Sequence, residues 1–419
     1  MLREFLDGKT DLDPAQLASA AGLPGDPELV RRLIGQLQQA LQHSGDGVDW
    51  GLATEQATQL AARSSVPSTP DERTALEQGL GVAALWLDEV TQISSLTAPP
   101  RLWSRTEWAK ATMPLWTQMA EPVATSIANA LTSVFDESAG DLEGLGAAGM
   151  SGIELPGAEG LEGMLANAGQ VMRNVGGTLF AMQLGQVVGQ LSTEVVSGGD
   201  VGVPLLDGEI VQAALVTQNV VDFGRGIDVP FDQVAIYLAI RELAHARLFR
   251  HAKWLRLHLL SAIADYSRGV RIDVQRLQEL AADFDPSNPE ELRRAMSSGA
   301  LIPPKTQEQL AAHTRLETML ALVEGWVDVV TAQATARLPR AAAIAETVRR
   351  RRASGGPAES AFSTLVGLEL RPRRLREAAA MWQAVTDAVG STVRDGLWAH
   401  PDILPGSSDI DDPGFLVTR

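Results

Sequence analysis

The chain has 419 residues, of which 45% are hydrophobic and 21% charged, and its net charge is −17. Phosphate contacts need a positive surface, so we expect no nucleic-acid partner. The chain contains no cysteine, which excludes disulfides, thiolate zinc sites and cysteine nucleophiles. Only 5% of the residues are aromatic, which favours helices over a β-sandwich or barrel and predicts a mainly α fold.

Neither a signal peptide nor a membrane span is expected. The N-terminus lacks the basic and apolar regions of a signal peptide. The most apolar run, residues 175–188, contains two glutamines and is shorter than the roughly 18 apolar residues of a membrane span. We interpret its Gly185-x-x-x-Gly189 pattern as close packing between helices. These features predict a cytoplasmic protein that does not insert into membranes.

The first 136 residues predict an N-terminal helical region. Asp26-Pro and Thr69-Pro place a cap residue before a proline in the first turn of a helix. Helices are expected at 14–21, 27–43, 49–63, 70–93 and from about 104 to 135. Residues 137–160 are rich in Gly and Ala, and we interpret them as a flexible linker between two domains.

Residues 161–419 predict a second domain that is again mainly helical. A small β element is expected near 200–225, where β-branched residues lie between glycines. Helices are expected within 161–197 and at 230–249, 252–267, 272–284, 288–298, 304–336, 338–352 and 371–391. The tail from Pro401, rich in Pro, Asp and Gly, is expected to lie extended on the surface.

A degenerate zinc motif lies on the predicted helix 230–249. In the motif HExxH, two histidines one helical turn apart bind zinc, and the Glu acts as general base. Here Glu242 and His245 occupy the second and last positions, but Arg241 stands in place of the first ligand. A guanidinium stays protonated and has no lone pair for a metal.

Charged groups on so apolar a helix need partners, because burying them alone costs several kcal/mol. The best candidates are Glu324 and Asp328, which lie four residues apart on a second apolar helix and share a face. Some zinc proteases take a third ligand from a Glu on a later helix, and an Asp one turn on supports a histidine ligand.

At these residues the sequence resembles the zincin-like metallopeptidase type 2 family, most of whose members are described only as proposed hydrolases. The resemblance covers roughly 165–419 and depends on the following segments: Arg241 to Phe249, Trp254-Leu-Arg, Glu324-Gly-Trp-Val-Asp328, Gly367-Leu-Glu-Leu, Trp398, Leu404-Pro, Asp409-Ile and Pro413. Some relatives keep a full HExxH followed by Glu-Gly-His-x-Asp, where this chain has Arg241 and Trp326. The resemblance implies a zincin-like scaffold, with Glu242 as catalytic base.

By the same resemblance His245 and Glu324 are metal ligands, and Asp328 supports them from outside. We place Arg241, which departs from the family motif, in the same outer set. Two interpretations of this set follow. In the first, a zinc-dependent hydrolase recruits another ligand from Glu242, His251 or Glu317. In the second, Arg241 replaces the metal by pairing with Glu242 or Glu324, and His245 bonds to Glu324 or Asp328. The chain is then a non-catalytic interaction or scaffold protein with a peptide or protein partner.

The charge balance favours the second interpretation, because one Arg and one His offset much of the charge of three carboxylates. A di-iron bundle, the remaining use of ExxH, needs a second ExxH that the chain lacks. Two basic clusters, Arg349 to Arg352 and Arg371 to Arg376, either bind phosphate or an acidic partner or are solvated helix ends that pair with surplus carboxylates. The simpler interpretation is solvated helix ends.

Overall fold

The structure is a computed structural model that describes residues 48–126, 176–204, 212–269, 305–353, 356–368 and 374–418. The chain divides into two compact units. One comprises Met1–Trp50, Val123–Met182 and Val270–Pro304, and among its described residues Trp50 and Phe180 pack edge to face. The other comprises Gly51–Pro122, Gln183–Gly269 and Lys305–Arg419, and it contains the candidate site described below.

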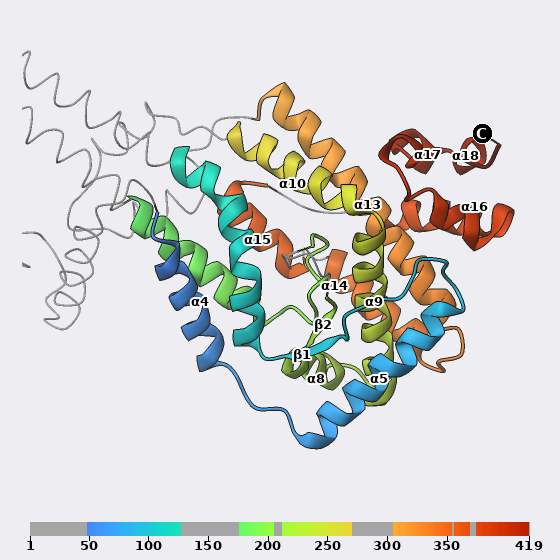
Figure 1. The fold of residues 1–419 in the computed structure, drawn as a ribbon, viewed down its shortest axis with the longest axis horizontal. Coiled ribbons are helices and arrows are strands. Elements are labelled where there is room, and N and C mark those ends of the chain that lie inside the picture. Colours follow the sequence, from blue (N-terminus) through green and yellow to red (C-terminus); the bar gives the residue numbers. More distant parts are fainter. Residues whose placement is uncertain are drawn as a thin grey trace, which may run out of the picture. The chain divides into compact units, whose positions relative to one another are not determined.

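The fold is mainly α, as predicted (Figure 1). Apart from short helices in the tail, the described residues form helices at 105–126 and 176–191 and the following labelled helices: α4 (Trp50–Arg63), α5 (Pro70–Asp88), α8 (Thr217–Arg225), α9 (Phe231–His251), α10 (Lys253–Arg268), α13 (Gln307–Ala334), α14 (Ala341–Ala353), α15 (Gly356–Val366) and α16 (Leu375–Gly396). Capping boxes explain two of the starts. Thr69 and Glu72 cap α5, and Thr306 and Gln309 cap α13.

The core of this unit is built on α9 and α13, whose middle turns are buried on every side. Helix α9 packs against both α5 and α13, and α13 packs in turn against α16. Glycines allow two of these contacts. A Cβ at Gly79 would lie 3.3 Å from Ala235 of α9, and one at Gly325 would lie 2.8 Å from the backbone of Ala378 of α16. These contacts keep α9 and α13 out of solvent and leave their charged residues in the interior.

The small β element predicted near 200–225 is present but shorter than expected. Strand β2 (Ala214–Val216) pairs in parallel with β1 (Arg101–Trp103), and Ser197 forms an isolated bridge to Leu215. The β-branched run after β2 forms the helix α8 and not the second strand that was considered. Its alternation of buried and exposed positions follows a helical period, which the sequence pattern alone did not resolve.

The Gly185-x-x-x-Gly189 pattern packs against α4, as its interpretation as a helix contact predicted. A Cβ at Gly185 would lie 2.6 Å from the carbonyl oxygen of Ala53, and one at Gly189 would lie 2.8 Å from Cβ of Leu60. In the part of the chain that the structure describes, every helix is too short or too polar to cross a membrane.

The C-terminal tail differs from its prediction. In place of an extended segment it forms a 3-10 turn, Pro401–Ile403, and the short helices α17 (Ser407–Asp411) and α18 (Pro413–Thr418). Both short helices pack against α16. This packing buries part of the tail, which its polar sequence did not indicate. The predicted linker 137–160 and the predicted helices 14–21, 27–43, 272–284 and 288–298 lie outside the described residues, so the domain division at the linker stays a prediction.

A buried carboxylate, Asp395, ties the end of α16 to α13 and to the segment after α5. It accepts hydrogen bonds from Thr91 Oγ1 at 2.7 Å, from the backbone N–H of Gln92 at 2.8 Å and from Trp326 Nε1 at 3.0 Å. The fully buried guanidinium of Arg394 donates to the same carboxylate at 2.8 Å. Three distant segments therefore share one charged group in the core.

Replacing Asp395 with Ala should lower the free energy of unfolding by about 3–5 kcal/mol, because the Arg394 guanidinium then stays buried without its counter-charge. Denaturation in urea, followed by tryptophan fluorescence, measures this loss. The matched control is Asp387→Ala on the exposed side of α16, where the carboxylate accepts a hydrogen bond from Gln383 and the cost should stay below about 1 kcal/mol. Equal stability of the two variants would contradict the role assigned to Asp395.

Candidate functional site

All five residues singled out in the sequence lie together in the interior. Helix α9 supplies Arg241, Glu242 and His245, and α13 supplies Glu324 and Asp328. Each is buried, and Glu324 is only 1% exposed. Two helices that are apolar on most faces thus pack together and enclose the polar residues on the turns where they meet. The structure therefore brings together the residues that the motif predicted, while their chemical roles stay predictions.

Arg241 binds the two carboxylates of α13. Its Nη2 donates to Glu324 Oε2 at 2.9 Å, and its Nη1 donates to Asp328 Oδ1 at 3.4 Å. One turn earlier on α9, the phenol of Tyr237 hydrogen-bonds to the Arg241 side chain, and burial raises the pKa of that phenol above its ordinary value. Arg241 therefore spans the gap between α9 and α13 at the position of the first zinc ligand in HExxH.

His245 contacts an acceptor with each ring nitrogen. Nδ1 lies 2.9 Å from the carbonyl oxygen of Arg241, and Nε2 lies 2.9 Å from Glu324 Oε1. Both ring nitrogens therefore lie within hydrogen-bond distance of a protein oxygen, and neither faces an open position for a metal.

A residue outside the motif completes the surroundings of Glu324. Arg352, on the last turn of α14, places Nη1 2.6 Å from Glu324 Oε1. Burial by itself raises the pKa of the Glu324 carboxyl. The charges of Arg352, His245 and Arg241 outweigh that effect and hold the pKa well below its usual range. Glu324 is therefore a buried carboxylate in its ionised form, and both its oxygens are engaged.

The other arginines of the 349–352 cluster extend the same network. Arg351 lies 3.2 Å from Asp200 Oδ2, and Arg349 Nε lies 3.3 Å from Asp328 Oδ2. Burial opposes ionisation of Asp200, but Arg351 and Arg352 lower the pKa of its carboxyl. Only Arg350 is a solvated helix-end residue of the kind that the simpler interpretation expected. Arg351 and Arg352 pair with carboxylates, as that interpretation expected, but they are not solvated, because their side chains reach inward to Asp200 and Glu324.

Glu242, the predicted base, holds the β element against α9. Its Oε1 accepts the N–H of Ala214 at 2.8 Å, its Oε2 accepts the N–H of Gly199 at 2.8 Å, and the Ser197 side chain bonds to the same carboxyl. Burial raises the pKa of Glu242 above its ordinary value despite these bonds. Both carboxylate oxygens of Glu242 accept backbone hydrogen bonds, so the side chain is directed at the β element and not at an open substrate space.

Two glycines let the 198–202 loop close over the site. A Cβ at Gly199 would lie 3.0 Å from both Glu242 Oε2 and His245 Cβ. Gly202 has a φ of 79°, which favours glycine, and a Cβ there would lie 3.4 Å from Glu324 Oε1. This loop was not predicted from the sequence as part of the site. A Gly-Gly-Asp stretch before apolar residues was its only signal.

A zinc site needs three protein donors and an open fourth position. Of the expected donors, Glu324 is held by two arginines and His245 by two acceptors, and Arg241 stands in the remaining place. The other candidates lie apart: Glu317 pairs with His313 on α13, and His251 is exposed at the end of α9. Among the residues that the structure describes, no group of three His, Asp or Glu side chains is placed to hold a metal. As arranged, these residues do not fit zinc.

The lowered pKa of Glu324 predicts a specific pH dependence. Glu324→Gln should reduce the free energy of unfolding by about 3–5 kcal/mol at pH 7, because the variant leaves buried cations without a counter-charge. As the pH falls below the ordinary value of 4.5, the unfolded wild-type chain takes up the proton first. The gap between wild type and variant should therefore shrink steadily below that pH.

Urea titrations at a series of pH values measure that gap. Glu317→Gln, on the same helix but outside the network, is the matched control and should cost less than about 1 kcal/mol. A gap that stays constant from pH 7 down to pH 3 would contradict the ionised, paired state of Glu324.

Known proteins resemble this chain in sequence profile and in fold. The sequence profile of the zincin-like metallopeptidase family matches residues 48–417. Comparison with curated proteins gives no match. Among solved structures, a proposed hydrolase with a novel fold from Chloroflexus aurantiacus has a TM-score of 0.57 and 18% identity, over 89% of this chain and 98% of that one. This likeness concerns the fold. The profile covers most of the sequence, and the chain therefore belongs to the zincin-like metallopeptidase family.

Proposed function

We propose that this chain is a hydrolase-related protein of the zincin-like family that works by binding a peptide or protein partner, with an ion-pair network in place of the metal. One observation carries the proposal. The guanidinium of Arg241 occupies the first ligand position and lies 2.9 Å from Glu324, the carboxylate that a zinc ion would need.

The charge balance of the network supports this function. Three carboxylates form its ion pairs, namely Asp200, Glu324 and Asp328, and four arginines pair with them, namely Arg241, Arg349, Arg351 and Arg352. Positive charge that zinc supplies in an active relative is thus already supplied by guanidinium groups. Adding a divalent cation would displace Arg241 and Arg352 from Glu324. Each buried guanidinium that loses its partner costs several kcal/mol.

Zinc-dependent hydrolysis is the second candidate. It is favoured by the family and by the positions of Glu242 and His245, which match the base and the second ligand of HExxH. The related Chloroflexus aurantiacus structure, described as a proposed hydrolase, points the same way. This candidate requires Glu242 to leave the N–H groups of Gly199 and Ala214, and it requires Arg241 to leave Glu324. The two candidates therefore differ in whether the resting protein holds a metal at Glu324.

Metal binding separates the two candidates. Purified without chelator and dialysed, the wild-type protein should contain well under one zinc per chain. Arg241→His restores the first ligand and frees Glu324 Oε2, so this variant should bind zinc about 100-fold more tightly than wild type, or better. Inductively coupled plasma mass spectrometry gives the stoichiometry, and competition with a zinc-sensitive dye gives the affinity.

The matched control for added histidine is Arg340→His, an exposed position before α14 that should leave zinc affinity unchanged. Stoichiometric zinc in the wild-type protein, lost on Glu324→Gln, would overturn the proposal and establish the hydrolase. If Arg241→His gains no affinity over Arg340→His, the replacement of a metal by Arg241 is wrong.

A further inference from the structure

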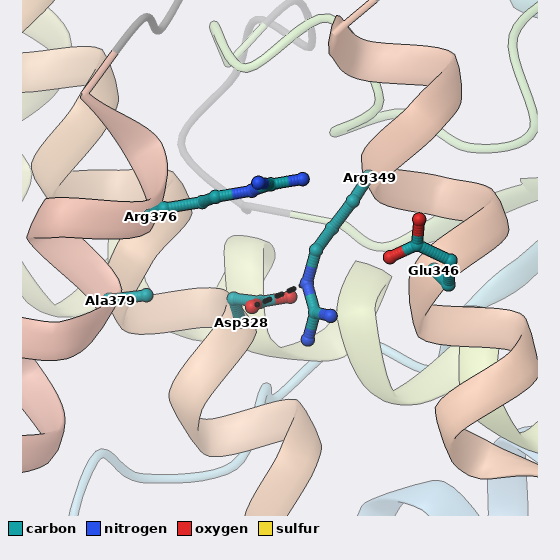
Figure 2. A pocket seen from close by; sticks show the side chains of 5 residues that line it. All are labelled: Asp328, Glu346, Arg349, Arg376 and Ala379. Atoms are coloured by element: carbon teal, nitrogen blue, oxygen red, sulfur yellow. Dashed lines mark hydrogen bonds and ion pairs between the residues drawn. The ribbon is translucent and has the colours of Figure 1, made fainter.

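A cavity of about 370 Å³ opens beside the ion-pair network, between α13, α14 and α16 (Figure 2). It is lined by Asp328, Glu346, Arg349, Arg376 and Ala379. Asp328 belongs to both places, because its Oδ1 faces Arg241 in the interior and its Oδ2 faces Arg349 at the cavity. The closed network and the open cavity therefore share one carboxylate.

Arg376 is an exposed arginine of the cavity wall. Its side chain extends from α16 across the cavity toward Arg349 (Figure 2). It forms no direct hydrogen bond to a described residue, but its charge adds to the hydrogen bond from Arg350 in lowering the pKa of Glu346. It lies in the first turn of α16, where the helix dipole disfavours a positive charge. Arg376 is exposed and lines the cavity, where its N–H donors are accessible to an anion.

The two acids in the cavity wall are already paired. Asp328 is engaged by Arg241 and Arg349, and Glu346 accepts a hydrogen bond from Arg350 Nε at 2.8 Å. Arg349 reaches Asp328 through Nε, and its two terminal nitrogens form no bond to other described residues. Donors for an anion thus remain on Arg349 and Arg376, on opposite sides of the cavity.

We propose that this cavity binds a carboxylate-bearing ligand, whose carboxylate lies between Arg349 and Arg376. Guanidinium groups match the planar geometry of a carboxylate with paired N–H donors. Asp328 and Glu346 in the wall repel a second negative charge on the ligand, which selects a singly charged group over a phosphate dianion. The volume lies within the usual range of small-molecule pockets, roughly 300–1,000 Å³.

The inference rests on the proposed function, since it names the ligand of a protein that works by binding. A peptide C-terminus and a small organic acid both carry this chemistry. Isothermal titration calorimetry on the full chain tests it with four probes: the peptide acetyl-Ala-Ala-Ala, the same peptide as its C-terminal amide, propionate and inorganic phosphate. The free-acid peptide or propionate should bind with a Kd below about 1 mM. The amide and phosphate should bind at least about 10-fold more weakly.

Two variants locate the site by different means. Arg376→Gln removes the unpaired cation at an exposed position, and Ala379→Leu fills the cavity without changing its charge. Each substitution should raise the Kd of the carboxylate probe by about 10-fold or more. The matched control Arg315→Gln, an exposed arginine of α13 away from the cavity, should bind as wild type does. Circular dichroism melting curves confirm that all three variants stay folded.

Peptide binding tighter than propionate identifies a peptide as the source of the carboxylate, and equal binding identifies a small acid. The proposal is overturned if no carboxylate binds below about 1 mM, if phosphate or the amide binds equally well, or if neither cavity variant weakens binding. None of these variants touches Arg241 or Glu324. If the carboxylate probes do not bind in the cavity, the zinc experiment still tests the proposed replacement of the metal independently.

Discussion

The structure depends on how one buried carboxylate, that of Glu324, is kept charged. An ionised group in a protein interior is stable only when its lost hydration is replaced by opposite charges and hydrogen bonds. Here Arg241 and His245 come from α9 and Arg352 comes from α14, while Glu324 itself lies on α13. Because the cations come from two other helices, the carboxylate is satisfied only when all three helices are packed as observed. Loss of any one of these partners leaves a charged group buried without its counter-charge.

Close backbone packing is the second requirement, and it follows from the first. Charged side chains reach one another only if the helices that carry them lie near together. Gly325, next to Glu324, lets α13 lie against α16, and Gly199 lets the loop before β2 lie on His245 and Glu242. Trp326 then donates to Asp395, which joins α13 to the end of α16. Each residue of Glu324-Gly-Trp thus has a structural role that does not involve a metal.

The chain belongs to a metallopeptidase family, and Arg241 stands where the motif HExxH has its first histidine. A divalent ion and a set of guanidinium groups solve the same electrostatic problem, which is the neutralisation of acids held between two helices. They differ in chemistry, since a guanidinium has no open coordination position for water. The interior network is closed, while the neighbouring cavity between α13, α14 and α16 is open to a ligand. Asp328, which faces both, links the two.

Much of this arrangement was predictable from the sequence. Caps such as Thr69 and Thr306 mark where helices begin, and the apolar runs around Arg241 and Glu324 show that these charged residues are buried and need each other. The inward-facing arginines of α14, the loop at Asp200 and the helical tail after Pro401 were not predictable. Hydrophobic periodicity reports whether a position is buried within its own element, so it identifies α9 and α13. It carries no information on which face a polar helix end presents to a distant partner. Only tertiary packing placed Arg352 2.6 Å from Glu324, because long-range charge pairing depends on the relative position of whole helices.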